Sequence, residues 1–140
     1  MAQYLMDTDH FTLYESAYPP LLHRLQAVPD GSVAIAAPTV QEALRGRFAT
    51  LAKVLPPDRV VEGYARLLRT FRALQELLVL PYDADCEREF QRLRGGRLRV
   101  GTLDLRIAAT ALTKGLTVVT RNRRDFGQVP GLVVEDWSAP

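Results

Sequence analysis

Short apolar runs of strand character alternate along this chain with longer helical segments, and this alternation limits its fold more than any other feature. Buried strands are indicated at residues 3–6, 33–37, 79–81 and 116–119, with a last edge strand at 132–134. Helices that connect successive strands favour a parallel sheet covered on both faces. We therefore predict an α/β fold, a three-layer α/β/α sandwich with a central, mainly parallel sheet. Residues 1–140 are expected to form one domain.

Turn and capping signals delimit the expected helices, which are residues 12–27, 39–54, 58–78, 83–94 and 102–114. The first follows a predicted turn at residues 7–12. Thr39 is expected to cap the second, because Glu42 stands three residues later as in a capping box. The third helix, capped by Asp58, carries apolar side chains at helical spacing. We expect these side chains in the core: Val61, Tyr64, Leu67, Leu68, Phe71, Leu74 and Leu78.

Acidic residues stand where these strands end or helices begin, namely Asp7 and Asp9, Glu42, Asp104 and Asp125. The carboxyl ends of parallel strands form one edge of a sheet, so residues distant in sequence can meet in a single crevice there. Carboxylates in one crevice repel one another unless a cation holds them. Hard oxygen donors suit Mg²⁺, or alternatively Mn²⁺, whereas zinc would call for histidine or cysteine. The pattern therefore predicts a divalent-metal site.

Each acid also has a purely structural explanation. Asp7 could satisfy backbone amides in its turn, Glu42 fits a capping box, and Asp104 suits the dipole of a first helical turn. Their joint placement favours the metal site over these separate roles. The two histidines, His10 and His23, do not form a ligand pair, and His10 is expected only as a turn residue.

Arginine dominates the basic residues, since only Lys53 and Lys114 of the 18 are lysine. The guanidinium group matches phosphate geometry, although a genome that favours arginine codons would give the same composition. Arginines cluster in residues 88–106 and 121–124, and both clusters flank proposed site acids. A charge run is usually a solvated face; the alternative is contact with a nucleic-acid backbone. The residues predicted for that contact are Arg97, Arg99, Arg121 and Arg123.

Targeting signals are not apparent. No apolar run is long enough to cross a bilayer, and the apolar residues 2–6 meet an acid at once, unlike a signal peptide. The single cysteine, Cys86, cannot form an internal disulfide. A cytoplasmic protein without a membrane partner is therefore expected.

Several stretches, taken with their order and spacing, resemble one family over nearly the whole chain. They are Tyr4–Asp9, Pro38–Gly46, Asp104–Ala109, Val118–Phe126, Val129–Leu132 and Glu135–Trp137. This arrangement resembles PIN-domain ribonucleases and, within that group, the VapC toxins of toxin-antitoxin pairs. The resemblance implies a PIN-like sandwich in which Asp7, Glu42 and Asp104 hold Mg²⁺, with Asp7 and Asp104 as the first direct ligands.

The resemblance also identifies two departures. Many PIN domains carry an aspartate where this chain has Asn122, so Asn122 or Asp125 fills the fourth position of the site. Asp9 stands where the toxins usually carry asparagine, which adds charge beside the metal. Thr8 and Thr120 match positions that orient the site. The predicted catalytic set is therefore Asp7, Glu42, Asp104 and Asp125, supported by Thr8, Asp9, Thr120 and Asn122.

The activity implied is metal-assisted hydrolysis of phosphodiester bonds in structured RNA such as tRNA or ribosomal RNA, with Glu42 positioning or deprotonating the attacking water. The resemblance further implies a homodimer and a cognate VapB-type antitoxin whose C-terminal segment covers the acidic site. Two alternatives stay open. A haloacid-dehalogenase-like phosphatase could use residues 7–9, but Lys53 and Lys114 are poorly placed for it. A PIN-fold module that binds RNA or a partner without catalysis would explain the altered residues at positions 9 and 122.

Overall fold

The computed structural model describes residues 1–140 and is built on a five-stranded sheet with the order β3-β2-β1-β4-β5. The strands are β1 (Tyr4–Met6), β2 (Val33–Ala36), β3 (Leu78–Leu80), β4 (Thr117–Val119) and β5 (Val134–Glu135). Every neighbouring pair is parallel, and β5 lies at an edge, as predicted. The central strand β1 is paired with β2 on one side and β4 on the other, so three strands that precede predicted site residues are neighbours.

Seven helices connect or follow these strands: α1 (Thr8–Glu15), α2 (Pro19–Gln26), α3 (Ala37–Leu51), α4 (Pro57–Gln75), α5 (Ala84–Arg94), α6 (Thr102–Lys114) and α7 (Arg123–Phe126). None of them combines the length and the apolar character that a membrane span requires. Gly115 ends α6 with a φ of 69°, the left-handed conformation that makes glycine a common residue after a helix.

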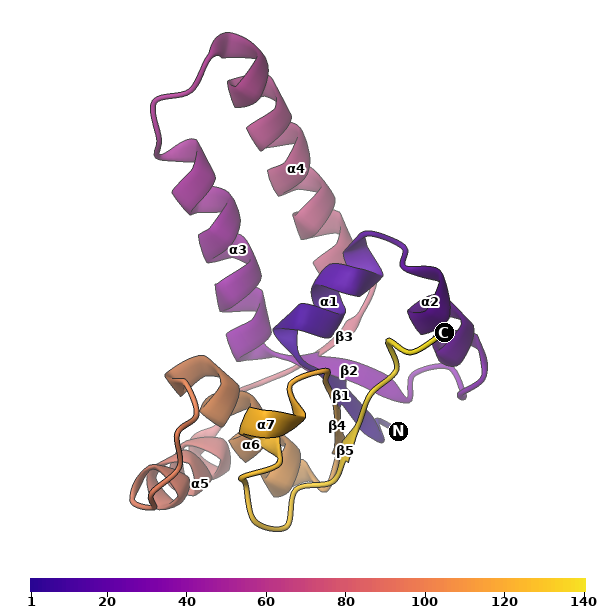
Figure 1. Cartoon of the computed structure of the whole chain (residues 1–140), viewed down its shortest axis with the longest axis vertical. Coiled ribbons are helices and arrows are strands. Elements are labelled where there is room, and N and C mark those ends of the chain that lie inside the picture. The colour runs from indigo at the N-terminus through magenta and orange to yellow at the C-terminus, as the bar shows by residue number, and fades with distance from the viewer.

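Two hydrophobic cores lie on opposite faces of the sheet, because successive strand residues point to opposite sides. Leu5 packs in one core with Phe90 of α5 and residues of α6. The next residue, Met6, packs in the other core with Phe11 of α1 and Leu21 of α2. These two layers of helices around one parallel sheet confirm the predicted α/β/α sandwich (Figure 1).

The single helix predicted at residues 12–27 is wrong. Helix α1 begins directly after Asp7 and ends at Glu15, and α2 begins separately at Pro19. Ala17 between them has a positive φ of 56°. Pro19 lacks the N–H that a continuous helix would need there, so the chain can start a new helix but cannot continue the old one.

The predicted cap at Thr39 is also wrong. Helix α3 begins at Ala37, directly after β2, so Thr39 lies within its first turn and its side chain is buried. The Thr39 hydroxyl accepts a hydrogen bond from the Thr8 hydroxyl at 3.3 Å, which ties α3 to α1. Glu42 then falls in the second turn of α3, away from the free backbone amides, and no capping role remains for it.

Most of the α4 side chains assigned to the core are exposed, so that prediction is wrong for them. Val61 is 71% exposed and Tyr64 60%, whereas Leu74 is buried. Helices α3 and α4 rise together away from the sheet in Figure 1, which leaves much of the apolar face of α4 without a neighbour. It forms an exposed apolar groove with residues of α3, lined by Leu44, Phe48, Tyr64, Leu67, Leu68 and Phe71.

Candidate metal centre

An open pocket at the carboxyl edge of the sheet gathers the acids that the sequence indicated. We call it the acidic pocket; its lining residues, none of them hydrophobic, are Asp7, Thr8, Asp9, Thr12, Glu42, Asp104, Arg121 and Asn122. They come from the ends of β1 and β4 and from α1, α3 and α6. The pairing of β1 with β2 and β4 brings these segments together, as expected for a parallel sheet.

Asp7 is the most firmly held acid of the pocket and is only 3% exposed. One carboxylate oxygen, Oδ1, accepts a hydrogen bond from the backbone N–H of His10 at 2.8 Å. The other, Oδ2, accepts one from the Thr120 hydroxyl at 2.5 Å, and that hydroxyl oxygen accepts from the Asn122 N–H at 2.8 Å. A carboxylate oxygen can accept a second bond, so Asp7 is oriented without being saturated.

Asp104 records the crowding of negative charge in the acidic pocket. Partial burial, followed by the nearby carboxylates of Glu42, Asp7 and Asp125, raises the pKa of Asp104 from 3.8 to about 6. Desolvation and like charges both disfavour the ionised form. A divalent cation among these carboxylates would remove the repulsion, which makes the pocket chemically suited to one.

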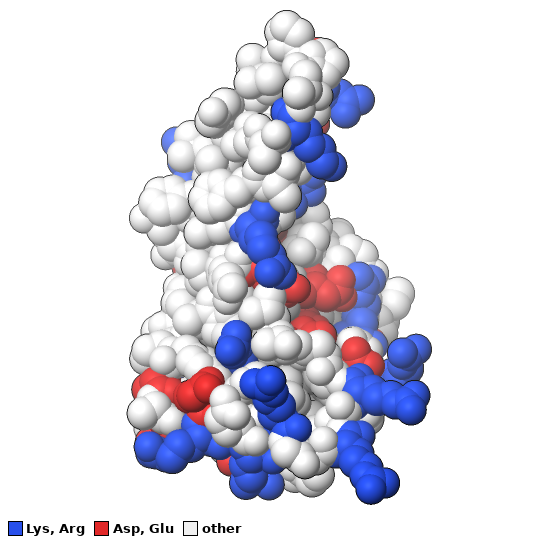
Figure 2. All heavy atoms as spheres, turned by 90° about the vertical axis from the view of Figure 1, so that its left-hand side faces the viewer, with Lys and Arg blue, Asp and Glu red and all other residues white.

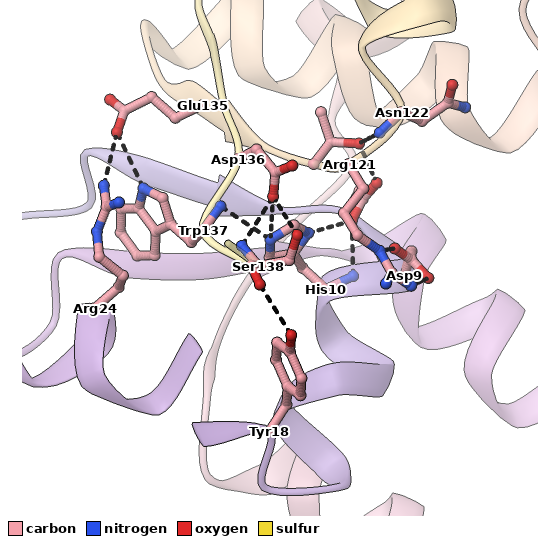
Figure 3. Close-up of polar contacts among 12 residues, drawn as sticks. Asp9, His10, Tyr18, Arg24, Arg121, Asn122, Glu135, Asp136, Trp137 and Ser138 are labelled. Atoms are coloured by element: carbon pink, nitrogen blue, oxygen red, sulfur yellow. Dashed lines mark hydrogen bonds and ion pairs between the residues drawn. The ribbon is translucent and has the colours of Figure 1, made fainter. Parts of the chain in front are cut away.

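The extra acid at position 9 is paired within the protein. The Arg121 guanidinium donates from Nε to Asp9 Oδ2 at 2.6 Å and from Nη2 to Asp9 Oδ1 at 2.8 Å (Figure 3). This pairing with Arg121 is the main reason that the pKa of Asp9 is lowered. Arg121, predicted to contact RNA, thus already has a bidentate partner at the rim of the acidic pocket.

Asn122, rather than Asp125, lines the acidic pocket. Asn122 caps α7 by accepting the N–H of Asp125, and its Nδ2 donates to Asp125 Oδ2 at 2.9 Å. Asp125 therefore lies behind Asn122, with Arg124 Nε 3.7 Å from its other oxygen. Its charge still acts on Asp104. Of the two residues considered for the fourth position, Asn122 has the place and Asp125 supplies charge from behind it.

His10 is a site neighbour that the sequence reasoning missed, since it was expected only as a turn residue. It is fully buried, its Nε2 accepts the Trp137 backbone N–H at 3.3 Å, and its Nδ1 lies 3.5 Å from Asp7 Oδ1 (Figure 3). Because Nε2 accepts, the proton of the neutral ring is on Nδ1, facing Asp7. No local pattern could reveal this, because Trp137 is 127 residues away in sequence.

Two groups of residues are candidates to hold a metal. Asp7, Asp9 and His10 bring ligand atoms within 4.8 Å of one another. In this group, however, Asp9 is occupied by Arg121, and both His10 nitrogens face internal partners. Asp7, Glu42 and Asp104 instead open into the same pocket and repel one another. This all-oxygen set, with the Asn122 carboxamide beside it, fits a hard divalent cation.

The other arginines predicted to contact RNA are exposed around the acidic pocket but do not line it. Arg97 and Arg99 lie in the loop between α5 and α6, and Arg123 begins α7. Arg106, from the same cluster, has its guanidinium 4.7 Å from the Phe90 ring and serves packing. Figure 2 shows basic side chains above and below a central acidic patch, an arrangement that would attract a polyanion towards the acids.

Known proteins resemble this chain along its full length. It is 29% identical to the tRNA(fMet)-specific endonuclease VapC of Salmonella typhimurium, over 98% of this chain and 99% of that protein. The toxin-antitoxin complex VapBC of Salmonella typhimurium, solved bound to DNA, contains a chain with a TM-score of 0.72 and 26% identity, covering 98% of this chain and 99% of that one. A chain of VapBC2 from Rickettsia felis, solved with promoter DNA, gives a TM-score of 0.76 at 22% identity, covering 96% and 98%. The PIN domain matches residues 15–132, most of the sequence, and the chain belongs to the PIN-domain family.

Proposed function

We propose that this chain is a metal-dependent endoribonuclease that hydrolyses phosphodiester bonds in structured RNA such as tRNA or ribosomal RNA. The observation that carries the proposal is the convergence of Asp7, Glu42 and Asp104, without internal cationic partners, on one pocket lined only by polar residues. The name of the Salmonella relative, an endonuclease specific for tRNA(fMet), supports RNA as the substrate class.

The candidate ligands are Asp7, Glu42 and Asp104, and Mg²⁺, or Mn²⁺ in its place, is the ion proposed. Bound there, such an ion would polarise a phosphoryl oxygen and lower the pKa of a water molecule. Asp7 is kept in one orientation by the His10 N–H and the Thr120 hydroxyl. Glu42 is less buried than Asp7, and we assign a carboxylate oxygen of Glu42 to take the proton of the attacking water.

Asn122 and Asp125 act on this site in different ways. The Asn122 amide lines the acidic pocket and can donate to a phosphate oxygen. Asp125, listed above in the predicted catalytic set, is placed behind Asn122 and acts through its charge on Asp104. We assign it a positioning role.

We also propose that the protein is the toxin of a toxin-antitoxin pair and works in the cytoplasm as a homodimer. Similar chains were solved as VapBC complexes, which supports a VapB-type antitoxin as its partner. The segment of the antitoxin that inhibits would cover the acidic pocket. A basic side chain would fit among Asp7, Glu42 and Asp104, because those acids have no internal cation.

The test is cleavage of total cellular RNA by purified protein, with Mg²⁺, with Mn²⁺ and with EDTA, followed by mapping of new 5′ ends. We expect discrete cuts that EDTA and Asp7→Asn both abolish. Asp30→Asn, which changes an exposed carboxylate in the turn before β2, is the matched control and should cut like the native protein. An absence of cuts in several RNA pools with either metal would favour the PIN-fold binding module without catalysis.

A further inference from the structure

A second polar hollow lies beside the acidic pocket, between α1, α3 and α4. It encloses about 340 Å³, and three of its lining residues are arginines: Arg47 of α3 and Arg66 and Arg69 of α4. We call it the arginine pocket. None of these arginines was among the RNA contacts predicted from sequence, because they do not form a run: they are brought together only by the antiparallel packing of α3 against α4.

The guanidinium groups of the arginine pocket lack partners within the protein. No ion pair or hydrogen bond engages Arg47, Arg66 or Arg69, and Arg47 Nε is buried without any acceptor. Burial, and then the charge of Arg66, lowers the pKa of Arg47. A buried donor without a partner is costly unless a ligand satisfies it, so this arrangement favours a bound anion.

Acidic residues in the same hollow do not cancel this charge. Glu15 and Glu62 also line it, so three guanidiniums face two carboxylates. Glu15 in addition accepts a hydrogen bond from the Thr70 hydroxyl at 2.5 Å. The pocket therefore keeps positive charge for an incoming group, and the fork of donors on a guanidinium matches the oxygens of a phosphate.

The position of the arginine pocket decides which anion it suits. Thr12 of α1 lines both this pocket and the acidic pocket, so the two hollows share a wall. An RNA strand with one phosphate at the acids extends its neighbouring phosphates along the surface on either side. The acids repel such a strand, and a group of unpaired cations next to them would offset that repulsion.

We propose that the arginine pocket binds a backbone phosphate of the RNA strand whose neighbouring phosphodiester lies in the acidic pocket. This inference rests on the proposed function and deepens it, because it gives the strand a direction, from the acids towards the α3–α4 hairpin. A phosphate contact of this kind positions RNA without reading its sequence.

The test compares two charge-matched double variants of the full chain. Arg66→Gln with Arg69→Gln empties the pocket of two guanidiniums on α4, whereas Arg59→Gln with Arg72→Gln removes two exposed arginines of α4 that do not line it. Arg47 is left intact, since it is partly buried and its loss could affect folding. Thermal midpoints of both variants confirm that they fold.

We expect the pocket variant to raise KM for RNA cleavage about tenfold with little change in kcat, and the control to remain close to the native protein. Binding of unfractionated tRNA in EDTA should lose salt dependence in the pocket variant, by about 0.7 in the log-log slope per arginine for single-stranded contact. Equal KM and equal salt slopes for the two double variants would overturn the inference.

Two further results separate this inference from the proposed function. If the native protein cuts no RNA, the proposed function fails, and the tRNA binding in EDTA still decides whether the pocket holds a phosphate. If the pocket variant binds and cuts RNA normally but loses a co-expressed antitoxin, the pocket serves a carboxylate of a protein partner and the phosphate assignment is wrong.

Discussion

Replacing Asp104 with asparagine should stabilise the metal-free protein at pH 7.5. The pKa of Asp104 is raised from 3.8 to about 6, first by burial and then by Glu42, Asp7 and Asp125. A shift of about 2 units corresponds to roughly 3 kcal/mol against the ionised form. Because Asp104 is only about half buried, solvent screening reduces this to about 1.5 kcal/mol. For a chain of this length, that is about 5 °C in the thermal midpoint.

The pH dependence fixes the sign of the effect. A carboxyl with a raised pKa destabilises the fold fully above its folded value, near 6, and the penalty disappears as the pH falls towards 3.8. In EDTA, the advantage of Asp104→Asn over the native protein should therefore be largest at pH 7.5, smaller at pH 5 and absent near pH 4. Differential scanning fluorimetry across this range measures it, with Asp30→Asn as the control that should change little.

Metal addition provides the complementary measurement. A cation that binds only the folded protein stabilises it by mass action, so Mg²⁺ should raise the midpoint of the native protein. Asp104→Asn removes a ligand and should respond much less. If Asp104→Asn is no more stable than the native protein in EDTA at pH 7.5, the carboxylates do not repel one another strongly and the argument for a cation from their crowding fails.

Three other substitutions test single contacts around the acidic pocket. Arg121→Gln should cost about 0.5–1 kcal/mol in urea denaturation, and almost nothing in an Asp9→Asn background, because the exposed ion pair is then already broken. Thr120→Val removes the hydroxyl donor to a candidate ligand and should weaken Mn²⁺ binding about tenfold by calorimetric titration, while an unchanged affinity would contradict its positioning role. His10→Ala should destabilise the fold by about 2 kcal/mol and speed amide exchange at Trp137, and slow exchange there would mean that the tail is held by other contacts.

The sheet and the main acids could be predicted because their signals are local. Each strand is a short apolar run, and Asp7 and Asn122 follow such runs within three residues. Glu42 and Asp104 lie near helix starts that the sequence marks with Pro38 and Gly101. The rule that parallel strands share one carboxyl edge then brings these residues together without knowledge of the strand order.

What failed depends on partners that are remote in sequence. The pattern of α4 identifies an apolar face but not what covers it, and in the structure Tyr64 and Phe71 are left exposed on the hairpin. His10 obtains its role from Trp137, and Asp9 obtains its neutralisation from Arg121, 112 residues away. One sequence contains no periodicity that joins such positions.

The two departures from the family pattern turn out to have compensating partners. Asp9 adds a carboxylate where the VapC toxins usually carry asparagine, but the bidentate bond from Arg121 cancels its charge, so the number of unpaired acids in the acidic pocket does not increase. Asn122 lacks a charge, but its amide holds Asp125, whose charge still acts on Asp104. The residues that made a non-catalytic module attractive therefore leave the electrostatics of the acidic pocket close to those of a site with asparagine at position 9 and aspartate at position 122, and the case for a bound divalent cation is undiminished.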